Sequence, residues 1–423
     1  MNSLINLGGS FGLALTAILL WRRPPPVQPS GSQLHRGFLA AAVVFVTFAA
    51  FARAFAIYFL SDDFVLIRYA SEWTPSRVVP VFTTAGGDGF FRPIGYIQMG
   101  LDALWAGSSA AAWHTGALVL HAANSLLVML AAERLGASRL AGFYAAVLFA
   151  IHGTRPEAAV WIAGRFDLLA TLFLLAAFLL FPRLPAVSLL CFVLAVLSKE
   201  SAYVLPVWLT LCEFVKRRRR WGALIPFWFT AAVLLAYRLA LFHGIGGYPF
   251  SLSAGPTLKA VGVRLWAALY FPINWSTQPS TLLLALGVAY VAALIWTVLR
   301  TRPAGRLWLP LLFLLTGILP VLPLLGIGPQ LANARVLYLP SAAFCVLLAM
   351  AVDGLPVRAR YAAAGAIALF HLAALQHNLD AWEYASRQVR AFCIAGAGSA
   401  PTQIRGVPAL ANGREECIAL ARR

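Results

Sequence analysis

Long apolar runs follow one another along most of this sequence, and short polar segments separate them. Hydrophobic residues make up 61% of the chain and charged residues 11%, whereas a soluble domain is typically about 45–50% apolar and about 25% charged. A helix needs roughly 20 apolar residues to cross a bilayer. The sequence therefore predicts an all-α polytopic membrane protein with about 11–12 transmembrane helices. The expected spans are residues 4–21, 37–60, 113–133, 140–152, 167–182, 185–198, 202–215, 222–242, 281–299, 307–326, 336–352 and 361–377.

The net charge of +18 is concentrated in the short segments between the apolar runs, for example at Arg22–Arg23, Lys216–Arg220 and residues 300–306. Connections rich in Arg and Lys mark the cytoplasmic side of a membrane protein. The charge therefore indicates a lipid bilayer as the partner and argues against nucleic acid. We expect a bacterial inner membrane, with the first long loop, the other outer loops and the tail in the periplasm.

The first apolar run, residues 4–21, is not preceded by basic residues and is not followed by a cleavage site. A secretory signal has both features. The run is therefore expected to remain in the protein as a helix whose N-terminus lies outside.

The long outer loops are expected to contain helices of their own. Apolar residues recur among polar ones from Asp63 to Trp73, which predicts an amphipathic helix on the membrane surface. A second helix is expected from Phe90 to Trp105, and a third from Pro256 to Tyr270 within the loop 243–280. Asp88, which follows two glycines, is interpreted as a turn residue and not as a metal ligand.

Asp62 and Asp63 stand where the second apolar run is expected to leave the membrane. The chain holds only 15 acids, and a carboxylate has no partner in lipid. One interpretation is that Ser61 or Asp62 caps a surface helix and that both acids are solvated. The other is that the pair has a chemical function. The pair alone leaves both interpretations open.

Short apolar runs with polar ends indicate a cavity in the outer leaflet. The runs 140–152 and 185–198 would reach only about 20 Å, less than the ~30 Å of hydrocarbon. Ionisable residues at this depth point to a functional site, although structural pairs such as Lys199–Glu200 and Arg165–Asp167 would also explain them. The residues expected at the cavity are His152, Arg155, Glu157, Arg165, Asp167, Lys199, Glu200, Arg238 and Arg335.

Five segments between residues 61 and 341 combine polar residues with apolar neighbours in a fixed order. They are Ser61-Asp62-Asp63-Phe64; Phe91-Arg92-Pro93-Ile94 with His114 and His121; Phe149-Ala150-Ile151-His152 through Glu157-Ala158-Ala159-Val160-Trp161-Ile162-Ala163-Gly164-Arg165-Phe166-Asp167; Ser198-Lys199-Glu200-Ser201-Ala202; and Asn333-Ala334-Arg335-Val336-Leu337-Tyr338-Leu339-Pro340-Ser341. Together they resemble the membrane glycosyltransferases of the C superfamily (GT-C), which use polyprenyl-phosphate-linked sugars. Within it they are most similar to the transmembrane O-mannosyltransferase branch that often carries TPR repeats.

The chain also departs from that family's pattern. The family usually has proline after the histidine at 152, where this chain has Gly153, and often an acid before Arg335, where this chain has Ala334. No TPR repeats follow, so recognition of partners through such repeats is not expected.

The resemblance implies a GT-C-like transmembrane catalytic domain at residues 37–377. It is preceded by a helix and a basic cytoplasmic loop at 1–36 and followed by a small periplasmic tail at 378–423. The implied reaction moves a sugar from a polyprenyl-phosphate-linked donor to a hydroxyl of a periplasmic protein, glycan or lipid.

The residues themselves suit such a transfer. A base must deprotonate the acceptor hydroxyl, and cations must stabilise the departing lipid phosphate. Asp62 or Asp63 is the expected base, Asp62 being favoured by the resemblance, and Glu157 is expected as a second acid at the cavity. The candidates for binding the lipid phosphate are Arg335, Arg238, Lys199, Arg165, Arg92 and His152. An alternative for Arg238 is that it extends to the outer headgroups.

No cofactor is required beyond the lipid-linked sugar, which acts as a co-substrate. A divalent metal is compatible with the reaction but not necessary, and no His or Cys spacing indicates a zinc site. His114 and His121 are seven residues apart and are expected to pack between helices.

Two other classes of function remain alternatives. A lipid or solute transporter, such as a flippase, would also have a charged outer cavity, but internal repeats are expected of it and none is evident. A membrane scaffold without activity would need neither the aspartate pair nor the inward cations.

The cysteines fall into two groups. Cys191, Cys212 and Cys345 lie in apolar spans and are expected to pack there. Cys393 and Cys417 lie in the polar tail, which the topology places where disulfides persist. A disulfide between them would close a loop of about 24 residues, and the chain-entropy model gives it roughly 3–3.5 kcal/mol. Free thiols are the alternative. We expect the bridged tail to cover the acceptor site.

Overall fold

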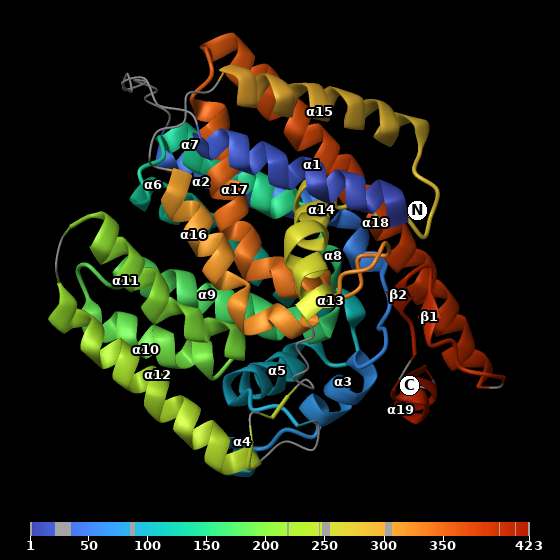
Figure 1. Ribbon diagram of the computed structural model, residues 1–423. Coiled ribbons are helices and arrows are strands. Elements are labelled where there is room, and N and C mark those ends of the chain that lie inside the picture. Colours follow the sequence, from blue (N-terminus) through green and yellow to red (C-terminus); the bar gives the residue numbers. More distant parts are fainter. Residues whose placement is uncertain are drawn as a thin grey trace. The chain divides into compact units, whose positions relative to one another are not determined.

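The computed structural model describes residues 2–21, 35–84, 89–217, 220–244, 246–247, 254–300, 307–396, 398–410 and 412–421. Asp88 and the basic clusters at 22–23, 218–219 and 301–306 lie outside these residues, so their interpretation stays a prediction. The described chain is helical almost throughout (Figure 1). One short hairpin joins β1 (Gln403–Ile404) to β2 (Val407–Pro408) in antiparallel pairing.

The protein is an all-α polytopic membrane protein, as its composition predicts. Within the described ranges, five helical segments are long and apolar enough to cross a bilayer. They are α6 (Ala110–Arg134), the segment Ile162–Leu180 that contains α9 (Arg165–Leu180), α12 (Trp221–Phe242), α15 (Thr281–Arg300) and the segment Ala334–Asp353 that contains α17 (Tyr338–Asp353). Shorter apolar helices are α2 (Arg36–Ala50), α7 (Arg139–Ile151), α10 (Pro185–Val196) and α16 (Trp308–Gly317).

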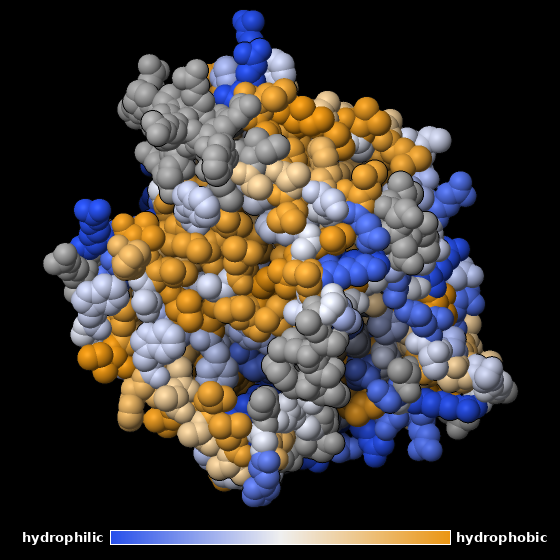
Figure 2. All heavy atoms as spheres, viewed as in Figure 1, coloured by the Kyte–Doolittle hydropathy of each residue, from blue (hydrophilic) through white to orange (hydrophobic). Residues whose placement is uncertain are grey.

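Apolar side chains cover much of the visible surface (Figure 2). On α12, for example, Ile225, Phe229 and Val233 are exposed. Water would not tolerate an apolar surface this large, whereas lipid matches it. The exposed apolar helix faces therefore support the membrane assignment independently of helix length.

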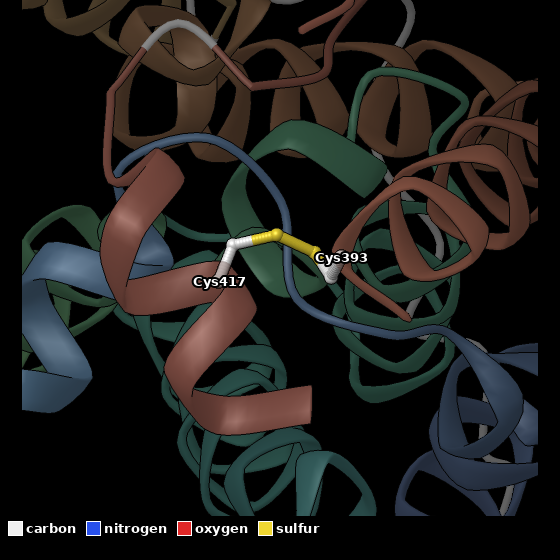
Figure 3. Close-up of a disulfide and its surroundings, with 2 residues drawn as sticks. All are labelled: Cys393 and Cys417. Atoms are coloured by element: carbon white, nitrogen blue, oxygen red, sulfur yellow. A yellow bond between two sulfur atoms is a disulfide. The ribbon is translucent and has the colours of Figure 1, made fainter. Parts of the chain in front are cut away.

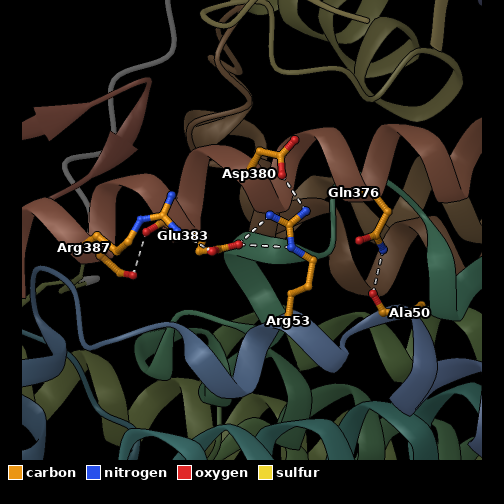
Figure 4. Close-up of polar contacts among 7 residues, drawn as sticks. Ala50, Arg53, Gln376, Asp380, Glu383 and Arg387 are labelled. Carbon is orange, nitrogen blue, oxygen red and sulfur yellow. Dashed lines mark hydrogen bonds and ion pairs between the residues drawn. The ribbon is translucent and has the colours of Figure 1, made fainter. Parts of the chain in front are cut away.

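The remaining expected spans are helical too, but three boundaries differ from the prediction. The run 307–326 is an α-helix only to Gly317, and the 3-10 helix η7 (Leu319–Leu324) follows it. The run 37–60 is an α-helix only to Ala50; a 3-10 turn, η1 (Ala52–Ala56), and extended chain follow. Arg53 on this turn forms ion pairs with Asp380 and Glu383, both at 2.5 Å (Figure 4). The last run does not end at 377, because α18 (Val357–Ala395) continues as one helix into the polar tail.

The chain forms two compact units. Unit 1 comprises Met1–Ala52, His121–Pro156 and Ser253–Leu379, and unit 2 comprises Arg53–Leu120, Glu157–Leu252 and Asp380–Arg423. The domain boundaries expected at residues 36 and 377 describe a functional division of the chain. The two compact units do not test that division, so it stays a prediction.

Unit 1 is built around α17, most of whose side chains are buried. It packs against α7 and α16, and α7 in turn packs against α2, where Val43 and Ala146 are fully buried. α1 (Asn2–Trp21) packs against α14 (Leu265–Tyr270), and Thr16 Oγ1 lies 2.9 Å from the Tyr270 hydroxyl.

A tight contact in unit 1 surrounds Gly153. A Cβ atom on this residue would lie 2.6 Å from the carbonyl oxygen of Pro272, so no side chain fits there. The Nδ2 of Asn378 donates to the carbonyl oxygens of both Gly153 and Pro272 at 2.7 Å. The glycine at this position is therefore required by the packing of a loop against α18.

Unit 2 contains α9, α10, α11 (Leu205–Val215) and α12; α10 packs against α9 and α12, and α11 packs against α12 and α9. The outer-loop helices α3 (Asp63–Ser71) and α5 (Pro93–Ala106) pack against each other. The expected helices in the loops are thus confirmed, including residues 254–270 of unit 1. The expectation that α3 lies on the membrane surface is wrong, because its apolar residues Phe64, Ile67 and Ala70 are buried in the protein.

Candidate functional site

Asp62 and Asp63 lie on a turn at the start of α3. Ser61, directly before them, has a left-handed backbone with φ of 49°, which is strained for a residue other than glycine. Such a conformation persists only where the surroundings hold it. Here the Ser61 N–H donates to the carbonyl oxygen of Ala409 at 2.6 Å, and the Asp63 N–H donates to Leu60 at 3.0 Å.

Asp63 is a structural residue of this turn. Its side chain is buried, with 1% relative exposure; Oδ2 accepts from the Leu60 N–H at 3.0 Å and Oδ1 from the Ala163 N–H at 3.3 Å. Burial raises the pKa of Asp63 well above its ordinary value, and the backbone hydrogen bonds from Leu60 and Ala163 only partly oppose this rise. The charge of Asp62 raises the pKa further. Both carboxylate oxygens of Asp63 are thus occupied by backbone N–H groups.

Asp62 is half-buried and presents its carboxylate differently. Its Oδ1 accepts a hydrogen bond from Nδ2 of Asn412 at 2.8 Å. In the part of the chain that the structure describes, no other side chain donates to this carboxylate. Of the two adjacent carboxylates, that of Asp62 is therefore the more accessible to a bound molecule.

A second group of charged residues in unit 2 surrounds Glu200, and we call Arg92, Asp167, Lys199, Glu200 and Arg238 the Glu200 cluster. Arg92 Nη2 lies 2.8 Å from Glu200 Oε1, and Arg238 Nη1 lies 3.9 Å from Oε2. Lys199 Nζ lies 2.6 Å from Asp167 Oδ2. Three cations face two carboxylates, so the cluster has a surplus of one positive charge.

Glu200 remains ionised within this cluster. Its burial alone would raise its pKa, but the charges of Arg92 and Lys199 and the hydrogen bond from Arg92 outweigh burial and lower the pKa to about 2. The surplus positive charge of the cluster is suited to an additional anion, such as a phosphate.

The Asp62 turn and the Glu200 cluster contact the same short segment, η3 (Ile162–Gly164) and the first turn of α9. The Ala163 N–H donates to Oδ1 of Asp63. Three residues later, the centre of the Phe166 ring lies 5.2 Å from the guanidinium carbon of Arg92. Both groups belong to unit 2. The turn that carries both aspartates and the cations of the cluster are therefore connected through one structural segment.

The ion pairs expected from sequence, Arg165–Asp167 and Lys199–Glu200, are wrong. Arg165 pairs with Asp102 and donates to the carbonyl oxygen of Trp113 at 2.6 Å, whereas Asp167 pairs with Lys199. Residues one or two positions apart do not face each other on a helix, which is why neighbours in sequence are poor partners. Arg165 is fully buried with its charge compensated, so the structure gives it a role in packing.

Two of the expected phosphate ligands lie in unit 1. His152 is buried; its ring nitrogens lie 2.9 Å from the carbonyl oxygen of Leu269 and 2.9 Å from Oγ1 of Thr154, which is a structural arrangement. Arg335 is half-buried on η8 (Ala334–Leu337).

The other polar residues expected at the cavity belong to both units. Arg155, in unit 1, donates to the carbonyl oxygen of Phe149 at 2.7 Å and to Oγ of Ser341 at 2.8 Å. Glu157, in unit 2, is buried on α8 (Pro156–Ala159). His114 and His121 are both fully buried between helices, which confirms their expected packing role.

Three features of the site escaped the sequence analysis. Asn412 was not singled out, and nothing in the sequence connects it to Asp62. Asp102 is a single acid within an apolar helix, a signal that was available. The left-handed backbone of Ser61 has no sequence signature. Among the described residues, no group of three or more His, Cys, Asp or Glu side chains is placed to hold a metal ion.

The tail contains a disulfide between Cys393 on α18 and Cys417 on α19 (Arg414–Ala421), whose Cα atoms are 5.3 Å apart (Figure 3). α19 packs against α3, and Glu416 Oε1 lies 2.9 Å from Nη1 of Arg68. The tail therefore lies beside the helix that begins at the aspartate pair.

The fold and the candidate site are those of a multi-pass helical membrane protein. The candidate site combines the half-buried carboxylate of Asp62 with the buried, net-positive Glu200 cluster. No family profile matches the chain. It is similar to Protein O-mannosyl-transferase Tmtc1 of Drosophila melanogaster, with 32% identity over 99 residues. The match covers 23% of this chain and 12% of that protein's length.

Proposed function

We propose that this protein is a membrane glycosyltransferase that moves a sugar from a polyprenyl-phosphate-linked donor to a hydroxyl of an acceptor. The active site would face the periplasm from a bacterial inner membrane. The local similarity to an O-mannosyltransferase supports glycosyl transfer in general. The residue assignment rests on a difference between the two aspartates of the turn. Both side-chain oxygens of Asp63 accept hydrogen bonds from backbone N–H groups, whereas the side chain of Asp62 accepts from the Asn412 amide.

In the proposed reaction, the Asp62 carboxylate accepts the proton of the acceptor hydroxyl. The hydroxyl oxygen then attacks the anomeric carbon, and the bond from that carbon to the phosphate oxygen breaks with its electron pair. The leaving group is the polyprenyl phosphate. Cations that neutralise the charge growing on this phosphate lower the barrier, since they act where charge develops.

The cations of the Glu200 cluster are the first candidates for this role. Arg92 and Arg238 face one carboxylate, and together with Lys199 they give the cluster a surplus positive charge that favours a phosphate. Gly247 lies against Arg238: a Cβ there would be 3.3 Å from the guanidinium Nη2. The absence of a side chain at this position favours the approach of a bulky anion.

The other expected site residues are sorted by their environment. Lys199 remains a candidate through the same cluster, and Arg335 and Glu157 remain a proposed donor ligand and second acid. Arg165 and His152 are bonded within their own units, so we do not retain them as donor ligands.

The proposal is tested with purified protein in proteoliposomes. A polyprenyl-phosphate donor with a radiolabelled sugar is added together with hydroxyl-bearing acceptors, and release of polyprenyl phosphate and label in the acceptor are both measured. Transfer by the wild type that is lost in Asp62→Asn and kept in Glu415→Gln, an exposed tail acid, supports the proposal. Movement of donor or sugar across the bilayer without covalent transfer would instead support the transporter alternative.

A further inference from the structure

We propose that the C-terminal segment, residues 398–410 and 412–421, contributes one positioning residue to the Asp62 site. Asn412 is the positioning residue for the Asp62 carboxylate, and the Cys393–Cys417 disulfide holds Asn412 in place. The inference rests on the proposed function, because it assigns a role in a reaction for which Asp62 is the base.

Three contacts connect the segment to the chain on both sides of Asp62. The carbonyl oxygen of Ala409 accepts from the Ser61 N–H at 2.6 Å, and the Asn412 amide donates to Asp62 Oδ1 at 2.8 Å. Glu416 pairs with Arg68, one and a half turns along α3. The strained turn and the carboxylate therefore share their partners with a segment some 350 residues away in sequence.

Gly413 makes the contact close enough to fix the position of its neighbour. Its φ is +80°, a conformation that favours glycine, and a Cβ there would lie 2.9 Å from Cβ of Phe64. The backbone of the segment thus rests directly on α3. Because Asn412 precedes this contact, its side chain is held beside Asp62.

The segment is itself anchored to α18. The guanidinium carbon of Arg405 lies 3.6 Å from the centre of the ring of Tyr384 on α18. Within the segment, the N–H groups of Ala409 and Leu410 donate to Thr402 and Pro401. The side chains of Cys393 and Cys417 are both buried, with 1% and 0% relative exposure. The disulfide closes the segment at its far end, so Asn412 lies between two fixed points.

Loss of either element should act on turnover more than on donor binding. Without Asn412 the carboxylate of Asp62 is free to rotate away from the acceptor hydroxyl, and misplacement of a reacting group lowers the rate. The described contacts of the segment are made with residues 61–68 and with α18. The Michaelis constant for the donor should therefore stay close to that of the wild type.

The test compares Asn412→Ala and the double variant Cys393→Ser/Cys417→Ser with the wild type in proteoliposomes. Removing a hydrogen bond to a charged group should lower kcat about 10-fold, with the donor KM within about twofold of the wild type. The matched control is Gln403→Ala, which loses only a hydrogen bond inside the hairpin and should keep its kcat. Monodispersity and thermal unfolding of each variant show whether it is folded.

Thiol reduction gives a second measurement that does not depend on substitution. Dithiothreitol should lower the wild-type kcat to that of the double serine variant and leave that variant unchanged. Cys191→Ser, which removes a thiol outside the tail, should respond like the wild type. A wild-type kcat in Asn412→Ala, or a reduced wild type with undiminished turnover, overturns the inference while the proposed function stands. A wild type that transfers no sugar from any donor overturns both.

Discussion

Both units of the molecule bury ionisable side chains, but most of these side chains have different kinds of partner in the two units. In unit 1, His121, His152 and Arg155 direct their polar atoms to backbone carbonyls and hydroxyl groups of the same unit. In unit 2, charged groups pair with other charged groups, and one carboxylate, Asp62, lies at a half-buried position.

This difference shows what separates a structural polar residue from a site residue in a membrane protein. A side chain that satisfies a buried carbonyl cannot leave it without exposing an unpaired group. An ion pair shared among several partners can exchange one of them for a substrate at lower cost. The burial of an ionisable side chain therefore does not by itself make it a candidate site residue. The kind of group with which it pairs is the better guide.

The largest expected effect concerns the two aspartates of the turn. Asp62→Asn should lower the rate of transfer by about 10²–10⁴-fold, the usual contribution of a general base, and leave the thermal unfolding temperature unchanged. The asparagine oxygen can still accept from Asn412, so the turn keeps its hydrogen bond. Initial rates in proteoliposomes measure the loss. Retention of more than about a tenth of the wild-type rate would remove Asp62 from the role of base.

The next effect belongs to unit 1. Arg155→Ala should destabilise the folded protein by about 3–5 kcal/mol, since it leaves a cavity and the Phe149 carbonyl without its donor. Denaturation in detergent measures this change. The folded fraction of Arg155→Ala should have the same KM for the donor as the wild type. A large change in that KM would place Arg155 in the site and contradict the difference between the units.

Asp63→Asn should have a smaller effect, on stability. An asparagine side chain has one oxygen for the two N–H groups of Leu60 and Ala163, so one of these N–H groups would face the amide NH₂ and lose its acceptor. The free energy of unfolding should therefore fall by about 1–3 kcal/mol. The variant is compared with Asp62→Asn in the same unfolding assay. Equal unfolding temperatures for the two variants would contradict the structural role of Asp63.

The pH dependence of stability provides a further check on Asp63. Its pKa in the folded protein is raised above the ordinary value of 3.8, so the folded state holds the proton more tightly than the unfolded state. The contribution of this group is fully present below pH 3.8 and is lost as the pH rises through the folded pKa. Asp63→Asn should remove this part of the pH dependence, whereas Asp62→Asn should retain it.

The smallest expected effect is on donor affinity. Arg238→Ala should weaken binding of the polyprenyl-phosphate donor about 10-fold, while Arg92 continues to pair with Glu200 and limits the loss of stability. Binding of a fluorescent donor analogue measures this. An unchanged donor affinity would leave Arg238 as a structural partner of Glu200 only. Its burial beside Glu200 does not agree with the alternative from sequence, in which it extends to the outer headgroups.

Most of the fold could be predicted from the sequence, because long apolar runs in a membrane protein have few alternatives to a helix. Boundaries were harder. The helix that begins at Arg36 ends at Ala50 beside Arg53, whose charge is satisfied by Asp380 and Glu383 some 330 residues away. No local signal contains that information.

For the candidate site, the sequence supplied residues but not their partners. It pointed to Asp62, Arg165, Asp167 and Lys199, but the pairs Asp102–Arg165 and Asp167–Lys199 join residues 63 and 32 positions apart. Which cation meets which acid depends on how helices pack, and a single sequence does not specify that. The tail disulfide could be predicted from the sequence, because two cysteines in a short polar segment have few other partners.

The contact around Gly153 has a consequence for how this sequence can change over evolutionary time. A proline or any larger residue at 153 would collide with Pro272, whose carbonyl oxygen and that of Gly153 share one donor, Asn378. A substitution at 153 is therefore tolerated only together with changes at 272 and 378. In an alignment of close homologues, these three columns should covary, and chains with proline at 153 should lack the Pro272–Asn378 pair.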